Sequence, residues 1–319
     1  MKVGLIGIGG MGFVHFNCYK KMADVEICVA DVRVDMAKEK VNDASINVYG
    51  SLTELLANEN VDFVDICTPS YLHADLTVEA LNAGKHVLCE KPMSTSAKES
   101  ARMIEAADRN GKLLMVAHVV RFMAPYVYLK SVIDSGELGK PVHLMLDRLS
   151  STPLWSWENW MLDESKSGAV PMDLSIHDID FIQYVLGAPK SASAVWYRPK
   201  DNNDYISSEL IYDGFSVKIT GSWYKTDFPF TARYLAIFEN GYVKSDGDVI
   251  KNGEKVSLDL GDTSEDTGIN LSGADGYADE IAYFIDCIKN GRKPEMVTPE
   301  SSMASVKLVE ELKAGATIV

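Results

Sequence analysis

A short apolar run that ends in a glycine-rich turn constrains the fold of this chain more than any other feature. Residues 2–8 have the pattern of a strand, Gly7-Ile8-Gly9-Gly10-Met11-Gly12 ends this strand, and the residues after Gly10 have a helical pattern. Four more apolar, strand-like runs, at 25–30, 63–67, 86–89 and 113–117, alternate with helical stretches. Strands that alternate with helices form βαβ units with right-handed crossovers. The first part of the chain is therefore predicted to be an α/β domain with a doubly wound parallel sheet.

The pattern changes after about residue 120. A helix is expected from about 172 to 186, and residues 191–258 read as strands joined by three Asx-Gly pairs, each of which favours a tight hairpin turn. The pairs are Asp213-Gly214, Asn240-Gly241 and Asn252-Gly253. We therefore expect a Rossmann domain over 1–120 and an α+β domain over 121–319 with a large, mostly antiparallel open sheet. The last helix could belong to the second domain or pack back on the first.

Charge and cysteine content narrow the classes of partner. The chain has 46 acidic and 31 basic residues and a formal net charge of -15, so its surface repels nucleic-acid backbones. No apolar run is long enough to span a membrane, so a membrane partner is not expected. The 5 cysteines are an odd number and form no CxxC motif, which favours reduced thiols in a cytoplasmic protein.

The glycine loop has the features of a dinucleotide-binding fingerprint, because an acid, Asp31, ends the next strand. Glycine allows a tight turn and a close approach of the pyrophosphate, and the helix N-terminus supplies amide donors. Asp31 would bind both ribose hydroxyls and repel a 2′-phosphate, which favours NAD, while Arg33 leaves NADP open. The residues expected to hold the dinucleotide here are Gly7, Gly9, Gly10, Met11, Gly12, Asp31 and Arg33.

Three further motifs together resemble those of one family. They are Cys67-Thr68-Pro69-Ser70 with His73 after it, Gly84-Lys85-His86-Val87-Leu88-Cys89-Glu90-Lys91-Pro92, and Ser167-Gly168-Ala169-Val170-Pro171-Met172-Asp173-Leu174-Ser175-Ile176-His177-Asp178. Over essentially its whole length the chain resembles the Gfo/Idh/MocA oxidoreductases, named for glucose-fructose oxidoreductase and inositol dehydrogenase. One departure is Ser167-Gly168-Ala169, where the family often has three glycines before the Asp.

The resemblance implies a catalytic set of Lys91, Asp173 and His177. Lys91 would touch both substrate and nicotinamide ribose, with a Lys91-Pro92 peptide that is often cis in the family, and its charge would stabilise a developing alkoxide. On a helix, Asp173 and His177 share one face, and an imidazole with a pKa near ~6.5 can exchange a proton with a hydroxyl at neutral pH. A metal site of Asp173, His177 and Asp180 is conceivable from the residues alone, but the family generally uses no metal and we expect none.

The remaining candidate residues follow the same resemblance. Thr68, Pro69, His73 and Glu90 are assigned to the cofactor side. His118, Arg121, Trp155, Trp160 and Tyr277 are assigned to the substrate side, while His15 and His143 are expected to be structural or surface residues. Tryptophan faces stack on sugar rings, but burial as core is the alternative, and we expect it for at least two of Trp155, Trp157 and Trp160.

These features predict an NAD(P)-dependent dehydrogenase that transfers a hydride between nicotinamide and a secondary alcohol of a sugar, sugar derivative or cyclitol such as inositol. Two alternatives stay open: a non-catalytic NAD(P)-binding regulator of the same fold, and an oxidoreductase whose tightly held cofactor is recycled internally. The resemblance also implies a homodimer or homotetramer formed through the second domain's sheet. The residues expected on its free face are Tyr212, Trp223, Tyr224 and Tyr242.

Overall fold

The computed structural model describes residues 1–198, 203–258 and 275–319, and it divides into two compact units. The first unit contains residues 1–119 with the described residues 275–303, and the second contains 120–258 with 304–319. Helix α9 (Asp275–Asn290) therefore groups with the first unit, although the sequence assigned it to the second domain. The reason is packing: the Phe284 ring meets Phe63 of the first sheet edge-on, with centroids 5.8 Å apart.

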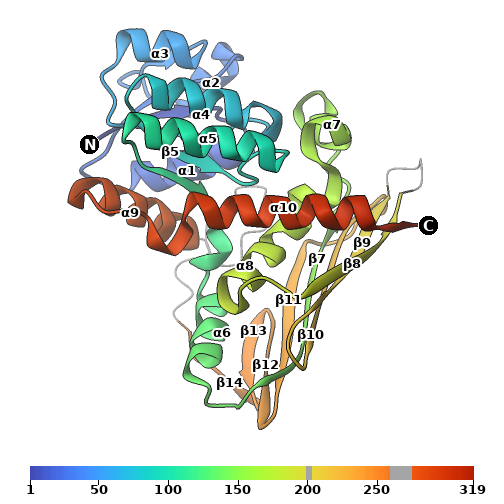
Figure 1. The fold of residues 1–319 in the computed structure, drawn as a ribbon. Coiled ribbons are helices and arrows are strands. Elements are labelled where there is room, and N and C mark those ends of the chain that lie inside the picture. Colours follow the sequence, from blue (N-terminus) through green and yellow to red (C-terminus); the bar gives the residue numbers. More distant parts are fainter. Residues whose placement is uncertain (199–202, 259–274) are drawn as a thin grey trace. The chain divides into compact units, whose positions relative to one another are not determined.

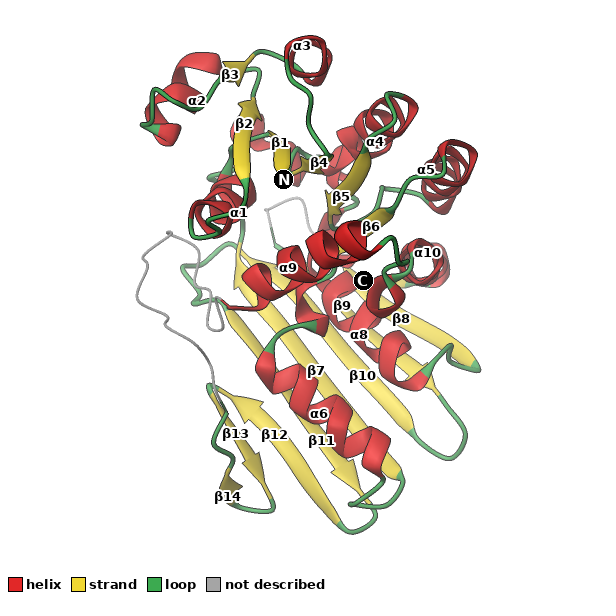
Figure 2. Cartoon of the chain, turned by 90° about the vertical axis from the view of Figure 1, so that its left-hand side faces the viewer, coloured by secondary structure: helices red, strands yellow, loops and turns green. Residues whose placement is uncertain are grey.

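The first unit contains a six-stranded parallel sheet in the order β3-β2-β1-β4-β5-β6 (Figure 2). Its strands are β1 (Lys2–Ile6), β2 (Glu26–Ala30), β3 (Val48–Tyr49), β4 (Phe63–Ile66), β5 (His86–Glu90) and β6 (Leu114–Ala117). The strand order reverses between β1 and β4, and ligands of such sheets bind at that reversal, beyond the carboxyl ends of the strands. The predicted Rossmann fold is confirmed; only the two-residue strand β3 was missed.

Helices cover both faces of this sheet. They are α1 (Gly10–Lys20), α2 (Val34–Val41), α3 (Leu52–Asn58), α4 (His73–Asn82), α5 (Ala97–Asn110) and α9. Local sequence sets their ends: in α5 the Ser96 side chain caps the N-terminus, and Gly111 ends the helix with φ 60°. Leu5, Val29 and Phe16 belong to a buried cluster that packs α1 and α2 against β1 and β2. This cluster fixes the position of the glycine loop, which joins β1 to α1.

The second unit is built on a nine-stranded sheet in the order β14-β13-β12-β11-β7-β10-β9-β8-β15 (Figure 1). Its strands are β7 (Pro141–Ser151), β8 (Ser191–Tyr197), β9 (Asp204–Ile211), β10 (Ser216–Tyr224), β11 (Thr231–Phe238), β12 (Gly241–Asp246), β13 (Asp248–Lys251), β14 (Glu254–Lys255) and β15 (Thr317–Ile318). Only β7–β10 and β8–β15 pair in parallel, so the expected mostly antiparallel sheet is confirmed. The three Asx-Gly pairs lie at the β9–β10, β11–β12 and β13–β14 turns, although Asn240-Gly241 turns without a positive φ.

Helices of this unit lie on one face of the sheet (Figures 1 and 2). They are α6 (Ala124–Ser135), α8 (Ile176–Leu186) with the π-helical turn before it (Pro171–Ser175), and residues 304–315 of α10 (Pro299–Gly315), while the short α7 (Glu164–Ser167) precedes the π-helical turn in the chain. The inward row of β7 and β10 includes Leu144, Ile219 and Gly221. A Cβ at Gly221 would collide with the Ser175 hydroxyl, so glycine lets the start of α8 approach the sheet closely.

No described helix of the second unit covers the opposite face of this sheet (Figure 1). Two of the four aromatic residues expected there lie elsewhere: Trp223 shares the helix-facing row with Gly221 and is 4% exposed, and Tyr212 is buried with its hydroxyl on the Gly187 carbonyl. Strand alternation explains the error for Trp223, because its register with β7 could not be read from the sequence. Tyr224 and Tyr242 are half-buried. None of the described helices is both long enough and apolar enough to cross a membrane.

Candidate functional site

In the glycine loop, packing requires glycine at Gly7 and Gly12 but not at Gly9. A Cβ at Gly7, where φ is 83°, would lie 2.8 Å from the Cys67 carbonyl oxygen, and a Cβ at Gly12 would collide with the carbonyl of Gly7. By contrast, nothing lies within 4 Å of a Cβ placed at Gly9, the residue before the first turn of α1. The space beside Gly9, next to the amides of Gly10 and Met11, therefore suits a pyrophosphate.

This difference predicts separable effects of two substitutions. We expect Gly9→Ala to fold at a cost of about 1–2 kcal/mol, because it alters a helix N-cap, but to bind NAD about 10- to 100-fold more weakly. Gly12→Ala should instead lower the melting temperature strongly, because its Cβ has no room. Isothermal titration with NAD and thermal melting measure the two effects. Unchanged NAD affinity in Gly9→Ala would contradict a dinucleotide site here.

Asp31 lies directly beside this loop and is 7% exposed. Its Oδ2 accepts the Ile8 N–H at 3.0 Å, and its Oδ1 accepts the Arg33 N–H at 2.9 Å and the Arg33 Nε–H at 3.3 Å. Lys40, on α2, was not identified from the sequence; its Nζ donates to the carbonyls of Ile8 and Gly9. Burial, with a smaller contribution from Arg33, lowers the pKa of Lys40. No spacing in the sequence indicates this contact, because it depends on how α2 packs beside the loop.

The carboxyl ends of β4 and β5 carry the next group of candidates. His73 is buried and lies between two carbonyls, Nδ1 2.8 Å from Pro92 O and Nε2 2.9 Å from Thr68 O. It therefore braces the turn after β4 against the segment after Lys91. The Lys91-Pro92 peptide is cis, as the resemblance implied. The Lys91 N–H donates to Oε2 of the buried Glu90 at 2.9 Å.

Asp173 and His177 lie in the second unit, where the chain enters helix α8. Asp173 is in the π-helical turn and is 8% exposed, and His177 is half-buried in the first turn of α8. The sequence predicted one continuous α-helix here. Single π turns are rare and recur at functional sites, because they change the face on which neighbouring side chains project.

The segment before this turn holds an alanine in a conformation that favours glycine. Gly168 has φ 76° and Ala169 has φ 62°, at the position where the family often has a third glycine. The left-handed region costs an alanine about 1–2 kcal/mol. The Ser167 hydroxyl compensates in part by accepting the Ala169 N–H at 2.9 Å.

Two buried ion pairs anchor α8. Arg148, on β7, donates to both oxygens of Asp178 at 2.8 and 3.0 Å, and Arg121 donates to both oxygens of Asp180 at 2.6 and 2.8 Å. Ser305 adds a third hydrogen bond to Asp180 at 2.9 Å. These contacts favour a structural role for Arg121 and Asp180 over the substrate and metal roles considered from the sequence. Arg148 was not predicted as a functional or structural residue, although an arginine in the inward row of a strand signals a buried carboxylate.

The aromatic and histidine candidates lie in different surroundings. Trp155 is 72% exposed and Trp157 is 37% exposed, so the expectation that at least two of the three tryptophans pack as core is wrong. The chain here turns through 3-10 and left-handed residues that leave the rings outside. Trp160 is half-buried. In the first unit, His118 is buried after β6, and Tyr277 is buried with its ring centroid 6.1 Å from that of His15.

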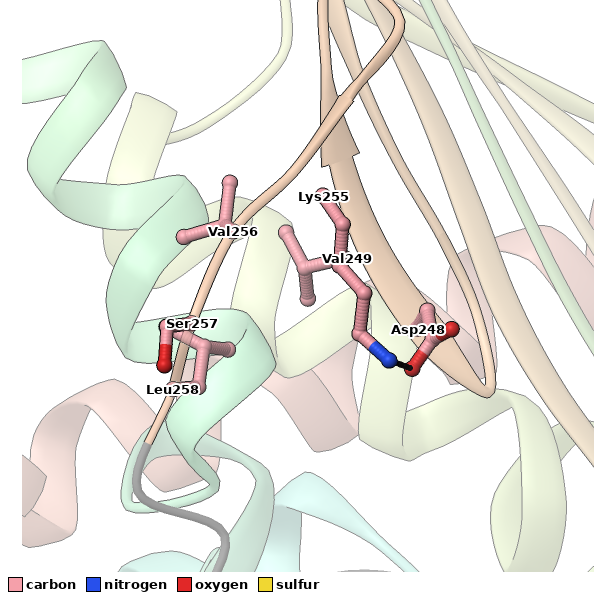
Figure 3. Close-up of a pocket in the computed structure, with 6 residues that line it drawn as sticks. All are labelled: Asp248, Val249, Lys255, Val256, Ser257 and Leu258. Carbon is pink, nitrogen blue, oxygen red and sulfur yellow. Dashed lines mark ion pairs between the residues drawn. The ribbon is translucent and has the colours of Figure 1, made fainter.

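A shallow depression of about 180 Å³ lies beside β13 and β14 in the second unit (Figure 3). An ion pair crosses it, with Lys255 Nζ 2.8 Å from Asp248 Oδ1. Its wall consists of Asp248, Val249, Lys255, Val256, Ser257 and Leu258. None of these is a candidate catalytic or cofactor residue, so the depression is not the proposed site.

Comparison with known families identifies the family of the chain. A family model described as an oxidoreductase family with an NAD-binding Rossmann fold matches residues 1–118, and the GFO/IDH/MocA C-terminal domain matches residues 126–244. The two matches cover more than half of the chain. The chain belongs to the GFO/IDH/MocA family of oxidoreductases.

Individual relatives are similar over different lengths. Myo-inositol 2-dehydrogenase of Thermotoga maritima is 31% identical over 190 residues, 59% of this chain and 55% of that protein. The match therefore spans little more than half the length of that curated relative. The scyllo-inositol 2-dehydrogenase (NAD(+)) of Bacillus subtilis is 25% identical over 309 residues, 92% of this chain and 88% of that protein.

Solved structures share the fold over the whole chain. A mutant of KijD10, a 3-ketoreductase from Actinomadura kijaniata solved with TDP-benzene and NADP, aligns with a TM-score of 0.84. The alignment covers 100% of this chain and 98% of that one at 21% sequence identity. At this identity the likeness shows the fold alone.

Proposed function

We propose that the protein is an NAD-dependent dehydrogenase that oxidises a secondary alcohol of a sugar, sugar derivative or cyclitol. The observation that carries the proposal is the glycine loop, in which the open space beside Gly9 leaves room for a pyrophosphate and Asp31 lies beside the loop. The family motifs add Lys91, Asp173 and His177, and relatives named inositol 2-dehydrogenases support the class of substrate.

Each residue then has a chemical task. Bound NAD supplies the hydride acceptor. The Lys91 ammonium holds the substrate oxygen and stabilises its developing negative charge. His177 takes the hydroxyl proton on its imidazole ring, whose Nδ1 is buried. Asp173, in the turn before His177, holds the orientation of the substrate or of the ring. Thr68, Pro69 and Glu90 line the nicotinamide side, with His73 as their brace.

The proposal is tested by absorbance at 340 nm with NAD or NADP across a panel of sugars, sugar acids and inositols. Lys91-dependent turnover of one substrate class establishes the dehydrogenase. Absence of turnover in a protein that binds NAD favours the regulator. Turnover only with a second, carbonyl substrate present, together with slow release of NAD, favours the recycled cofactor.

The choice of NAD over NADP rests on the charge of Asp31. We expect Asp31→Ser to raise the ratio of kcat/KM for NADP to that for NAD about 10- to 100-fold, because it removes about 1.4–2.8 kcal/mol of like-charge repulsion. Arg33 and Lys40 are then the cations nearest the 2′-phosphate. The control is Asp31→Ser with Arg33→Met, which should lose most of the gain. An unchanged ratio in Asp31→Ser would show that cofactor choice lies elsewhere.

We also propose a cytoplasmic homo-oligomer that associates through the uncovered sheet face. That face carries half-buried apolar side chains on its central strands, among them Met145, Leu149 and Leu235. Apolar side chains on an uncovered sheet face are typical of an interface, and here the Asp147–Arg233 ion pair lies among them. Light scattering at micromolar concentration should give a dimer or tetramer, and Met145→Arg should reduce the mass to that of a monomer. A monomeric wild-type protein would contradict the proposal. The five cysteines are all free, which suits a reducing compartment.

A further inference from the structure

A histidine with a carboxylate at each ring nitrogen is buried inside the first unit. His15 lies on α1 and is 0% exposed. Its Nδ1 is 2.8 Å from Asp65 Oδ2 on β4, and its Nε2 is 3.2 Å from Oε1 of Glu90, the last residue of β5. Tyr19, one turn further along α1, donates its hydroxyl to the same Asp65 oxygen at 2.8 Å.

This arrangement indicates the charge of the ring. The Nδ1 contact with Asp65 has hydrogen-bond geometry, whereas the 3.2 Å approach of Nε2 to Glu90 is a charge contact without that geometry. Two carboxylates that flank a buried ring stabilise its positively charged form. Burial alone lowers the pKa of His15, but the neighbouring Cys67 and Asp65 raise it well above its usual value. Burial raises the pKa of Glu90, but the adjacent His15 outweighs this effect and lowers it.

The other ionisable groups around His15 do not offer it a competing charge. Burial raises the pKa of Glu280, on α9, and it raises the pKa values of Cys67 and Cys18, so burial favours the uncharged form of all three groups. Tyr19 and Tyr277 are neutral ring neighbours. The buried imidazolium therefore has Asp65 and Glu90 as its counter-ions.

Glu90, the second counter-ion, is hydrogen-bonded to the backbone of the proposed catalytic residue Lys91. Glu90 uses Oε1 toward His15 and Oε2 to accept the Lys91 N–H at 2.9 Å. We propose that His15 is a positioning residue for Lys91: its imidazolium bridges Asp65 and Glu90 and fixes the carboxylate that holds the Lys91 backbone. The inference rests on the proposed function only in the role it gives Lys91. It also links helix α1, which begins at the glycine loop, to the end of β5.

A metal ion is the competing interpretation of the same atoms. The donor atoms of His15, Asp65 and Cys67 lie within 4.8 Å of one another, and no other group among the described residues is placed in this way. A metal bound at Nδ1 requires that nitrogen to be unprotonated. The contact of Nδ1 with Asp65, and the Tyr19 hydroxyl on the same oxygen, have the distances of ordinary hydrogen bonds. One equivalent of metal in the purified protein would overturn the proposal.

Substituting His15 with glutamine or with asparagine tests its two contacts separately. Glutamine places an amide nitrogen near the position of Nε2 and can still donate to Glu90, whereas asparagine places one near Nδ1 and can donate only to Asp65. The proposal expects kcat to fall about 10²-fold in His15→Asn and much less in His15→Gln, with the Kd for NAD within about threefold in both. If His15 had only a structural role, both substitutions would lower the melting temperature and the two variants would have similar kcat values. Equal kcat values in the two folded variants would overturn the proposal.

A second measurement needs neither turnover nor a variant that folds well. With 15N-labelled histidine, the His15 ring, identified as the ring whose signals remain when each of the other five histidines is replaced in turn, should show both nitrogens protonated at pH 7. A singly protonated ring at pH 7 would overturn the proposal, even if every His15 variant failed to fold.

Failure of the proposed function can be distinguished from failure of the role proposed for His15. If the wild-type protein shows no Lys91-dependent turnover, the dehydrogenase assignment fails, but hydrogen exchange still tests the role of His15. The Lys91 amide is identified with 15N-lysine by its loss in Lys91→Met. Its exchange should be at least tenfold faster in His15→Asn than in His15→Gln, and equal rates would overturn the proposal.

Discussion

Replacing Lys91 with methionine should lower kcat by about 10²–10³-fold while the Kd for NAD stays within about threefold. The physical reason is that the ammonium ion is needed where negative charge develops on the substrate oxygen, whereas its contact with the nicotinamide ribose is one of many that would hold the dinucleotide. Lys91 follows the last residue of β5, and its backbone is fixed by Glu90. Methionine keeps much of the side-chain length and removes only the charge. Steady-state rates at 340 nm and NAD titration measure the two quantities.

The same strand supplies a matched control. Lys85 precedes β5 at its opposite end, and its exposed Nζ donates to Asn60. Lys85→Met should leave kcat unchanged, because that end of a parallel sheet is not where ligands bind. If Lys91→Met turns over as fast as wild type, the catalytic assignment is wrong. If both variants lose activity equally, the loss reflects the strand and not the charge at the site.

Arg121→Met is expected to lower the free energy of unfolding by about 3–5 kcal/mol. The Arg121–Asp180 pair is almost fully buried, with side-chain exposures of 2% and 1%. Removing the guanidinium therefore leaves the Asp180 carboxylate buried without this counter-ion, and of the hydrogen bonds described above it keeps only the one from Ser305. The double variant Arg121→Met, Asp180→Leu should recover most of this loss, because apolar replacement of a whole buried pair is often close to neutral. Urea denaturation measures all three proteins.

A surface ion pair provides the comparison. Arg102 reaches Asp75 in the first unit, but the two side chains are 43% and 75% exposed. Arg102→Met should therefore cost no more than about 1 kcal/mol. Similar losses in Arg102→Met and Arg121→Met would contradict the argument from burial. A strong loss of substrate affinity in Arg121→Met without a loss of stability would instead restore the substrate-contacting role considered from the sequence.

Local signals were sufficient where a feature depends on neighbours in the sequence. The glycine loop after β1 and the turns at Asp213-Gly214 and Asn252-Gly253 follow from short motifs, because each is set by the conformation of a few adjacent residues, whereas the cis Lys91-Pro92 peptide was expected from the family resemblance. The alternation of apolar runs and helical patterns similarly predicted the parallel sheet. These patterns work because strand and helix periodicity are properties of a single segment.

Packing between distant segments decided the rest. The sequence could not show that Trp223 faces the helices, that Trp155 is exposed, or that α9 belongs with the first unit. The contact of His15 with Asp65 joins residues 50 apart in the chain, and that of Arg121 with Asp180 joins residues 59 apart.

The sequence by itself therefore determined the class of fold, the family motifs and the candidate chemical groups. The tertiary structure decided which charges are buried together, and so which of them position others. The physical reason is that burial and ion pairing are set by the surroundings of a side chain in three dimensions, and its neighbours in the chain do not specify those surroundings.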